Sequence, residues 1–296
     1  MQKILITGAS GFLGSEFISK FLNDFEIISF SRKNITKKKN FFIYENGSIE
    51  DKKFRKILKK HSPDIVLHFA NFGSMNDCEE NSELAFKVNV LGTLNVILGC
   101  IETKSKLIFT SSREVYGETK NKNSSEDDFV QPNNFLGLTK SFAENLITFA
   151  NKKYQLDYTI LRISNIYGIN GEKFVVKKML NTAIQEKIIF VQGGKQELNL
   201  VHVNDVLNIL KLVIKNPKLS SKQIFNVGSK DNITVLKLAE IIIELLNSDV
   251  KIKIKKARKS ETQFYKPNIK KIEEKFDYKN WINLDEGIKE IIKDLK

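Results

Sequence analysis

The chain has few residues of several kinds, and each scarcity excludes a class of protein. Two of its 296 residues are cysteine, Cys78 and Cys100, and their spacing matches no metal-ligand pattern. This argues against a disulfide framework and is typical of a reducing compartment, so we expect a cytoplasmic protein without a metal site. Apolar runs of about 18 residues are missing, and the opening "MQKILITGAS" resembles a strand more than a signal peptide. We therefore expect no transmembrane helix and no membrane partner.

Arginine is also scarce, although the chain is strongly basic. The formal net charge is +13, but only five of the 48 basic residues are arginine: Arg32, Arg55, Arg113, Arg162 and Arg258. The lysines are spread among asparagine and isoleucine and form no stripe, so we expect no nucleic-acid partner. The basic surface would still attract anionic small molecules. The positions of the few arginines are therefore informative.

Short apolar runs alternate with amphipathic stretches over the first 170 residues. The runs "KILITG", "FEIISFS", "DIVLHFA", "KLIFTSS" and "DYTILRISN" are typical of strands, and the stretches between them are typical of helices. The stretch "NSELAFKVNVLGTLNVILGCI" predicts one long helix, and the lysine-rich residues 34–40 predict a loop. Alternating strands and helices predict a Rossmann-type α/β fold with a doubly wound parallel sheet over residues 1–170.

The pattern changes after residue 170. Helices are predicted at 174–186, 203–215, 234–247 and 285–295, with "IIFVQG" and "QIFNVG" as short strands. We expect residues 171–296 to form mainly a smaller mixed α/β lobe that binds substrate, with some later segments returning to the first domain. A cleft between the two lobes would hold the ligand.

A glycine motif lies between the first strand and the first helix. "ILITGASGFLGSEF" places Gly8, Gly11 and Gly14 where a dinucleotide-binding loop needs a tight turn, a close approach to pyrophosphate and close helix packing. The helix N-terminus would then face the negative charge. The strand before the motif and the helix after it support dinucleotide binding over a merely structural turn.

The second strand ends without the acidic residue that usually holds a ribose 2′-hydroxyl. In "ISFSRKN", Ser31 occupies that position and Arg32 follows it. A carboxylate would repel a 2′-phosphate, whereas an arginine would bind it. We therefore favour NADP over NAD as the cofactor. The alternative is a solvated basic turn.

An ordered series of segments resembles the extended short-chain dehydrogenase/reductase family, the NAD(P)-dependent sugar-nucleotide epimerases and dehydratases. The segments are "TGASGFLG", "DIVLHFA", "NVLGTLNVI", "TSSREVYG", "LRISNIYG" and "LVHVNDV", and the resemblance covers nearly the whole chain. It implies a nucleotide-sugar substrate, a role in polysaccharide biosynthesis and a homodimer formed through two helices. It places a catalytic hydroxyl at Ser112, the acid of the dehydratases at Glu114 and the catalytic lysine at Lys140.

The resemblance also implies residues that bind cofactor and substrate. The implied cofactor contacts are Gly8, Ser10, Gly11, Phe12, Leu13, Gly14, Ser31, Arg32, Ser48, Ile49, Phe69, Ala70, Asn89, Thr110, Lys140 and Ile163. On the substrate side, Asn165 is offered by "LRISNIYG". The segment "ARKSETQFYKPNIKKI" resembles one in which an arginine binds the nucleotide diphosphate, which implies Arg258 as the phosphate clamp and Glu261 as a ribose contact. The alternative is a surface loop.

Three departures from the family pattern limit what can be carried over. Leu198 and Asn199 stand where members usually have Arg-Asp, and Ser48 replaces an aspartate that commonly binds adenine. The largest departure is in "NNFLGLTKSFAE", where Leu136 occupies the position of the catalytic tyrosine, four residues before Lys140. Leucine has no proton to exchange.

Three interpretations of Leu136 remain open. The acid/base role has moved, with Glu114 and Ser112 as candidates and with Thr139 and Tyr116 behind them. Alternatively, the protein binds cofactor without chemistry, as a sensor or partner protein of the same fold. In the third, the alignment slips and Tyr116 serves as the tyrosine. His68 and His202 lie in strand segments and are interpreted as structural hydrogen-bonding groups.

Overall fold

The structure, a computed structural model, describes residues 1–33, 42–119, 123–257 and 262–295. The chain divides into two compact units that are interleaved along the sequence. The first comprises Met1–Val115, Asn134–Arg162 and Val213–Phe225; the second comprises Tyr116–Asn133, Ile163–Leu212 and Asn226–Lys296. The sequence predicted a main boundary near residue 170 with some later segments returning to the first domain; in the structure the chain passes between the units after residues 115, 133, 162, 212 and 225. The predicted loop at residues 34–40 lies outside the described residues.

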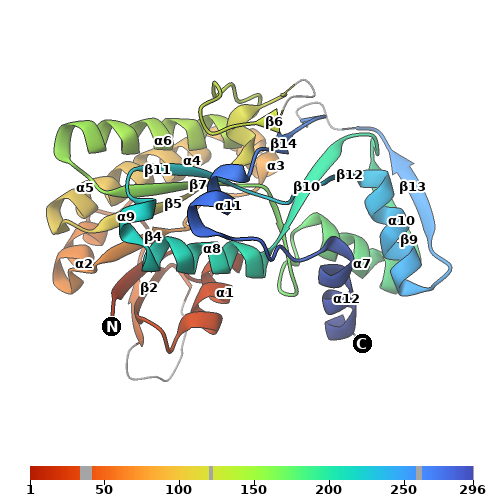
Figure 1. Ribbon diagram of the computed structural model, residues 1–296, viewed down its shortest axis with the longest axis horizontal. Coiled ribbons are helices and arrows are strands. Elements are labelled where there is room, and N and C mark those ends of the chain that lie inside the picture. The colour runs from red at the N-terminus through yellow and green to blue at the C-terminus, as the bar shows by residue number, and fades with distance from the viewer. Residues whose placement is uncertain (34–41, 120–122, 258–261, 296) are drawn as a thin grey trace. The chain divides into compact units, whose positions relative to one another are not determined.

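Within the described ranges, seven strands form one parallel sheet in the order β11-β7-β5-β4-β1-β2-β3 (Figure 1). These strands are β1 (Lys3–Thr7), β2 (Glu26–Ser31), β3 (Phe42–Asn46), β4 (Ile65–His68), β5 (Lys106–Ser112), β7 (Tyr158–Ile163) and β11 (Gln223–Val227). The strand order reverses between β1 and β4, and ligands of such sheets bind outside the carboxyl ends of the strands at this switch point. The predicted Rossmann-type fold is confirmed.

The strands form because their sequences are almost continuously apolar, as strands buried on both faces require. All six residues of β7 are buried, and so are four of the five in β1. A hydrophobic cluster on one face of the sheet includes Leu5, Phe54 and Ile147, which are fully buried. The cluster draws on three helices: α2 (Lys53–His61), α5 (Thr93–Thr103) and α6 (Phe135–Tyr154).

The long helix predicted before β5 is interrupted. It consists of α4 (Ser82–Phe86), a π-helical turn over Lys87–Gly92, and α5. By length and composition alone, Ser82–Thr103 is apolar enough to cross a membrane, which the sequence analysis did not anticipate. However, 56% of its most apolar window is buried within the protein, and the core helix of a globular protein passes the same test.

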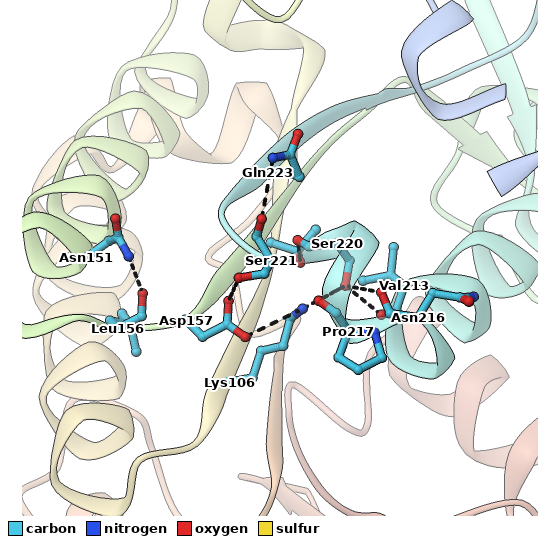
Figure 2. A network of polar contacts seen from close by, with 11 residues as sticks. Lys106, Asn151, Leu156, Asp157, Val213, Asn216, Pro217, Ser220, Ser221 and Gln223 are labelled. Atoms are coloured by element: carbon cyan, nitrogen blue, oxygen red, sulfur yellow. Dashed lines mark hydrogen bonds and ion pairs between the residues drawn. The ribbon is translucent and has the colours of Figure 1, made fainter. Parts of the chain in front are cut away.

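A buried lysine connects the returning segment Val213–Phe225 to the amino ends of β5 and β7 (Figure 2). Lys106 donates from Nζ to Ser220 Oγ at 2.7 Å, and its ammonium lies 3.8 Å from the carboxylate of Asp157. Ser221 Oγ donates to the same carboxylate at 2.7 Å. These contacts hold the strand "QIFNVG" beside β7 as β11, which corrects its expected place in the second lobe.

The second unit is mixed, as expected. Its small sheets are β12-β10-β8, β13-β9 and β14-β6, formed by β6 (Asn123–Ser124), β8 (Asn165–Tyr167), β9 (Ile188–Gln192), β10 (Glu197–His202), β12 (Asn232–Thr234), β13 (Lys251–Lys255) and β14 (Lys266–Pro267). Its longer helices are α7 (Val175–Glu186), α8 (Val203–Lys215), α10 (Val235–Leu246) and α12 (Leu284–Leu295). These match the four predicted helices within a residue at each end. Tyr167, Leu180 and Leu238 belong to its buried core.

Candidate functional site

The glycine motif forms a turn that other residues could not form. Gly8 follows β1 with a φ of +69°, and a Cβ there would lie 2.6 Å from the backbone nitrogen of Ala70. A Cβ on Gly14 would lie 2.5 Å from the carbonyl oxygen of Gly8. Gly8 is therefore required because of its backbone conformation and because Ala70 lies so close to it. Gly14 is required because helix α1 packs closely on the turn.

Helix α1 (Phe12–Phe21) begins at this turn and has no side-chain cap among the described residues. Its N-cap residue is Gly11, which is exposed together with Ser10, whereas Phe12 and Leu13 are half-buried. A helix N-terminus presents backbone N–H groups and the positive end of the helix dipole. The turn therefore fits the pyrophosphate of a dinucleotide, because a Cβ would fill the cradle and the helix N-terminus favours negative charge.

The end of β2 lies where a ribose 2′ substituent is expected. Ser31 is buried, and its hydroxyl donates to the carbonyl of Lys33 at 2.7 Å. The side chain of Arg32 is exposed, while its carbonyl accepts from Asn46 Nδ2 at 3.2 Å. The serine hydroxyl is thus directed at its own turn, and the arginine side chain remains accessible to an anion.

The residues after β3 were expected to contact adenine. Ser48 donates from its hydroxyl to the carboxylate of Glu50, and Ile49 is buried. The carbonyl of Ile49 accepts from Asn95 Nδ2 at 2.7 Å, which joins this segment to α5. Both residues follow the carboxyl end of β3, where Asn46 pairs with Ser31 of β2.

A buried hydrogen-bond chain fixes the carboxyl ends of β1 and β4. Thr93 donates from Oγ1 to the carbonyl of Asn89 at 2.6 Å, so it must accept from His68 Nε2 at 2.9 Å. His68 Nδ1 then accepts from Thr7 Oγ1 at 2.7 Å, and Thr7 Oγ1 accepts from the backbone N–H of Ala70 at 3.2 Å. Every proton is assigned when His68 is neutral, which confirms its interpretation as a structural hydrogen-bonding group.

Burial is the main reason why the pKa of His68 falls to about 3, and the nearby ammonium of Lys140 adds to it. The network holds Phe69 and Ala70, both half-buried, at the end of β4 beside the glycine turn. The π-helical turn directs Asn89 inward, where it accepts from the N–H of Phe72 at 2.7 Å and donates to Thr139 Oγ1 at 3.1 Å.

Lys140 lies in α6 and is 6% exposed. Its Nζ donates to the carbonyl of Thr110 in β5 at 2.8 Å and lies 4.8 Å from the ring centroid of Phe109. Burial lowers the pKa of its ammonium to about 8, against smaller opposite effects of Cys78 and Glu144. The side chain therefore lies at the end of β5, at the carboxyl edge that carries the glycine turn.

Ser112 and Glu114 follow along the same edge. The half-buried Ser112 accepts from the N–H of Glu114 at 3.2 Å. The buried Glu114 carboxylate lies 2.9 Å from a guanidinium nitrogen of Arg113 and accepts from Asn134 Nδ2 at 2.7 Å. Two partners thus fix the position of this carboxylate. Neither partner was predicted from the sequence.

The start of α6 carries Leu136, which is half-buried. Asn134 is the N-cap and accepts from the N–H of Gly137 at 2.9 Å, and the carboxylate of Glu79 accepts from the N–H of Phe135 at 2.8 Å. Asparagine directly before an apolar-periodic stretch is a sequence signal for such a cap. By contrast, Glu79 comes from α3 (Met75–Glu80), and no local pattern connects it to this helix.

The substrate-side residues are only partly described. Asn165 begins β8 and is half-buried, and among the described residues its buried Oδ1 has no hydrogen-bond partner. Ile163 ends β7 and is buried. The expected phosphate clamp Arg258 and the expected ribose contact Glu261 lie outside the described residues. Within the described ranges, no group of three or more His, Cys, Asp or Glu side chains could hold a metal ion.

Comparison with known proteins gives matches over the whole fold. Residues 4–228 match the NAD dependent epimerase/dehydratase family. The chain is 29% identical over 309 residues to a putative UDP-glucose 4-epimerase of Methanocaldococcus jannaschii, covering 99% of this chain and 98% of that protein. It is 27% identical over 273 residues to a dTDP-D-glucose 4,6-dehydratase of Dictyostelium discoideum, covering 83% of this chain and 62% of the relative.

Solved structures agree with this assignment of the fold. The UDP-glucose 4-epimerase of Thermotoga maritima, solved with UDP-glucose, superposes with a TM-score of 0.91 at 26% identity and covers 99% of this chain and 98% of its own. At 22% identity and TM-scores of 0.89, a Bacillus anthracis dTDP-glucose 4,6-dehydratase and a Thermus thermophilus UDP-glucose 4-epimerase share the fold, and both were solved with NAD.

Proposed function

Because the chain belongs to the NAD-dependent epimerase/dehydratase family, we propose that its first unit binds a nicotinamide dinucleotide and that the protein modifies a nucleotide-diphosphate sugar. The observation that carries this proposal is the glycine turn after β1, whose cradle a Cβ would fill, at the same sheet edge as Lys140. The nicotinamide, when bound, supplies a hydride acceptor or donor. The residues of the chain position it and move protons.

A panel of nucleotide sugars tests the proposal. The protein is incubated with each sugar and either NAD or NADP, and mass spectrometry follows loss of water and uptake of solvent deuterium. Water loss indicates a dehydratase, a new sugar isomer of unchanged mass indicates an epimerase that transfers hydride, and deuterium uptake shows that a carbon-bound proton exchanges with solvent. Reduction of a 4-keto sugar by NADH or NADPH indicates a reductase. Binding of neither dinucleotide in calorimetry would contradict the proposal at its first step.

We propose further that NADP is preferred over NAD. No carboxylate ends β2, and the exposed guanidinium of Arg32 is of the kind that binds a 2′-phosphate. Arg32→Ala should weaken NADP binding by about 1.5–3 kcal/mol, as is typical for hydrogen bonds to charged groups, and leave NAD binding unchanged. Lys33→Ala removes an adjacent exposed charge and serves as the control. Equal affinities for both cofactors would contradict this preference.

Of the three interpretations of Leu136, the one in which Tyr116 serves as the tyrosine is disfavoured, because the buried Tyr116 hydroxyl donates to Asn226 Oδ1 at 2.8 Å. Two interpretations of the chemistry are left. In the first, proton transfer has moved to Glu114 and Ser112, whose positions in the first unit are fixed by their own hydrogen bonds. In the second, favoured by the leucine itself, the chain is a catalytically depleted NADP-binding sensor or partner protein. Glu114→Gln should abolish turnover without changing cofactor binding in the first case. If activity appears only after Leu136→Tyr, the second interpretation is supported.

We also propose that Asn165 contacts the sugar, that Arg258 clamps the diphosphate and that Glu261 contacts a ribose. The unpartnered Oδ1 of Asn165 supports the first of these roles. Arg258→Ala should weaken binding of the correct nucleoside diphosphate by about 1.5–3 kcal/mol. If calorimetry showed an unchanged affinity of the Arg258→Ala variant for the nucleoside diphosphate, the diphosphate would be bound by other residues.

The protein is further proposed to form a homodimer through α5 and α6. Aromatic and aliphatic side chains are exposed along this helix pair and the adjacent α4, which together form an apolar face: Phe86, Leu91, Leu98, Phe135, Phe142 and Phe149. The ring centroids of Phe86 in α4 and Phe142 in α6 lie 6.1 Å apart, so the apolar side chains of these two helices are in contact. Exposed apolar patches of this kind mark protein interfaces.

A further inference from the structure

Lys140 is a buried ammonium without an ion-pair partner among the described residues. Glu144 lies one helical turn further along α6, where it could pair with Lys140. Both of its carboxylate oxygens are instead bonded to Arg162, at 2.7 Å to Nη2 and at 3.1 and 3.2 Å to Nε. Glu144 is thus paired with Arg162 and not with Lys140, whose charged form it would otherwise stabilise.

Three titratable groups face Lys140 from the elements around it: His68 from β4, Cys78 from α3 and Glu144 from α6. His68 is neutral in its hydrogen-bond chain, and burial raises the pKa of the Cys78 thiol to about 11, so neither is charged near neutral pH. The charge of Glu144 is balanced by Arg162. Desolvation therefore dominates, and the pKa of Lys140 falls to about 8.

Leu136 lies on the same face of α6, one turn before Lys140. An apolar side chain at this position can neither take a proton from Lys140 nor pass one to it. Glu144 on this face is paired with Arg162, which leaves the lysine Nζ, bonded to the carbonyl of Thr110 in β5, as the titratable group without a charged partner among the described residues. Glu114, the other candidate, is engaged by Arg113 and Asn134.

We propose that Lys140 itself is the acid and base that exchanges the hydroxyl proton of the sugar during hydride transfer, in place of the missing phenol. The inference rests on the proposed function. In the oxidative direction, the hydroxyl proton passes to the neutral amine of Lys140, and the carbon-bound hydrogen leaves with its electron pair to the oxidised dinucleotide. The products are a keto sugar, a reduced dinucleotide and an ammonium. Reduction reverses each transfer.

This role differs from one in which Lys140 only holds the cofactor. Lys140→Arg keeps a permanent positive charge and hydrogen-bond donors but cannot release a proton near neutral pH. We expect it to bind the dinucleotide within a few-fold of the wild type in calorimetry and to lose turnover by about 100-fold or more, as general acid–base catalysts do. Retention of a substantial part of the turnover would overturn the proposal.

A second variant shows whether turnover is lost because proton exchange is lost or because the arginine side chain is misplaced. Lys140→Cys, alkylated with 2-bromoethylamine, places a thialysine amine at the same position, and this amine is more acidic than that of lysine. We expect recovered turnover, with the acidic limb of the pH profile in the oxidative direction moved down by the difference between the two amine pKa values. Lys237→Cys, treated identically, is the exposed control and should leave the profile in place. Recovery without a shift would overturn the proposal.

A direct titration adds a readout that does not depend on turnover. The protein is labelled with ε-¹³C lysine, and the Lys140 resonance is assigned by its absence from Lys140→Arg. A midpoint near pH 8 supports the proposal, whereas a midpoint near 10.5, the ordinary lysine value, overturns it. If the sugar panel gives turnover but these tests fail, only this inference is lost. If the wild type turns over no sugar, the proposed function fails as well.

Discussion

The neutral state of His68 should make the stability of the first unit depend on pH in a measurable way. The ordinary pKa of histidine is 6.5, and burial lowers that of His68 to about 3 in the folded chain. Between these values the unfolded chain binds one more proton than the folded chain, so stability is complete above pH 6.5 and falls as the pH drops toward 3. The difference corresponds to about 5 kcal/mol, because each pKa unit is worth 1.36 kcal/mol.

His68→Gln isolates this contribution. Glutamine keeps a donor and an acceptor for Thr7 and Thr93 but does not titrate. At pH 7 we expect the variant to be less stable by about 1–3 kcal/mol, because the fitted hydrogen bonds are lost. Below pH 6, the difference in free energy of unfolding should shrink by about 1.4 kcal/mol per pH unit and then change sign.

The assay is urea denaturation of both proteins at pH 7, 6, 5 and 4, followed by a spectroscopic probe in the first unit. Carboxylates titrate over the same range in both proteins, so they cancel in the difference. Parallel stability curves would refute the reasoning, since they would mean that His68 takes up its proton equally in the folded and unfolded chains. Imidazole nitrogen shifts should also show the Nε2–H tautomer of His68 persisting below pH 5.

Three further outcomes are expected. Gly8→Ala should lower the free energy of unfolding by about 1–3 kcal/mol through backbone strain and should weaken dinucleotide binding in calorimetry. Unchanged binding would contradict the proposal that the glycine turn holds the pyrophosphate. Glu144→Gln should lower the free energy of unfolding by about 3–5 kcal/mol, since it removes the carboxylate charge that pairs with a buried guanidinium, whereas the exposed Glu240→Gln should cost less than about 1 kcal/mol. Phe142→Lys should give monomers in light scattering if the apolar face joins two copies; Phe129→Lys, at a 91% exposed position, is the control.

The elements that the sequence predicts well are those whose pattern is set by burial. Strands of the parallel sheet are apolar throughout, and the four later helices have clear amphipathic periodicity. The strand β3 was missed because its residues are only half-buried or exposed and include the polar Glu45 and Asn46. The π-helical turn was missed because its apolar composition resembles that of an ordinary helix.

The site was predictable only where one segment carries the signal. The glycine turn is local, so its tight conformation could be predicted from the spacing of its glycines. The partners of Glu114 and Lys140 are not, because Asn134, Thr110 and the Arg162 that neutralises Glu144 come from separate strands and loops. The sequence alone could identify the candidate side chains, but it could not show which of them form hydrogen bonds or ion pairs with other residues in the fold.

The interleaving of the two units has a consequence for synthesis on the ribosome. β7 ends at Ile163 and its neighbour β11 begins at Gln223, so about 60 residues are translated between them. At about 5–20 residues per second, the edge of β7 waits several seconds for its partner, and an unpaired strand edge is a template for pairing with other chains. Lys106, at the adjacent β5, waits about twice as long for Ser220, because the two residues are 114 positions apart in the sequence. A nascent chain stalled in this interval would expose the edge of β7 to pairing with other chains.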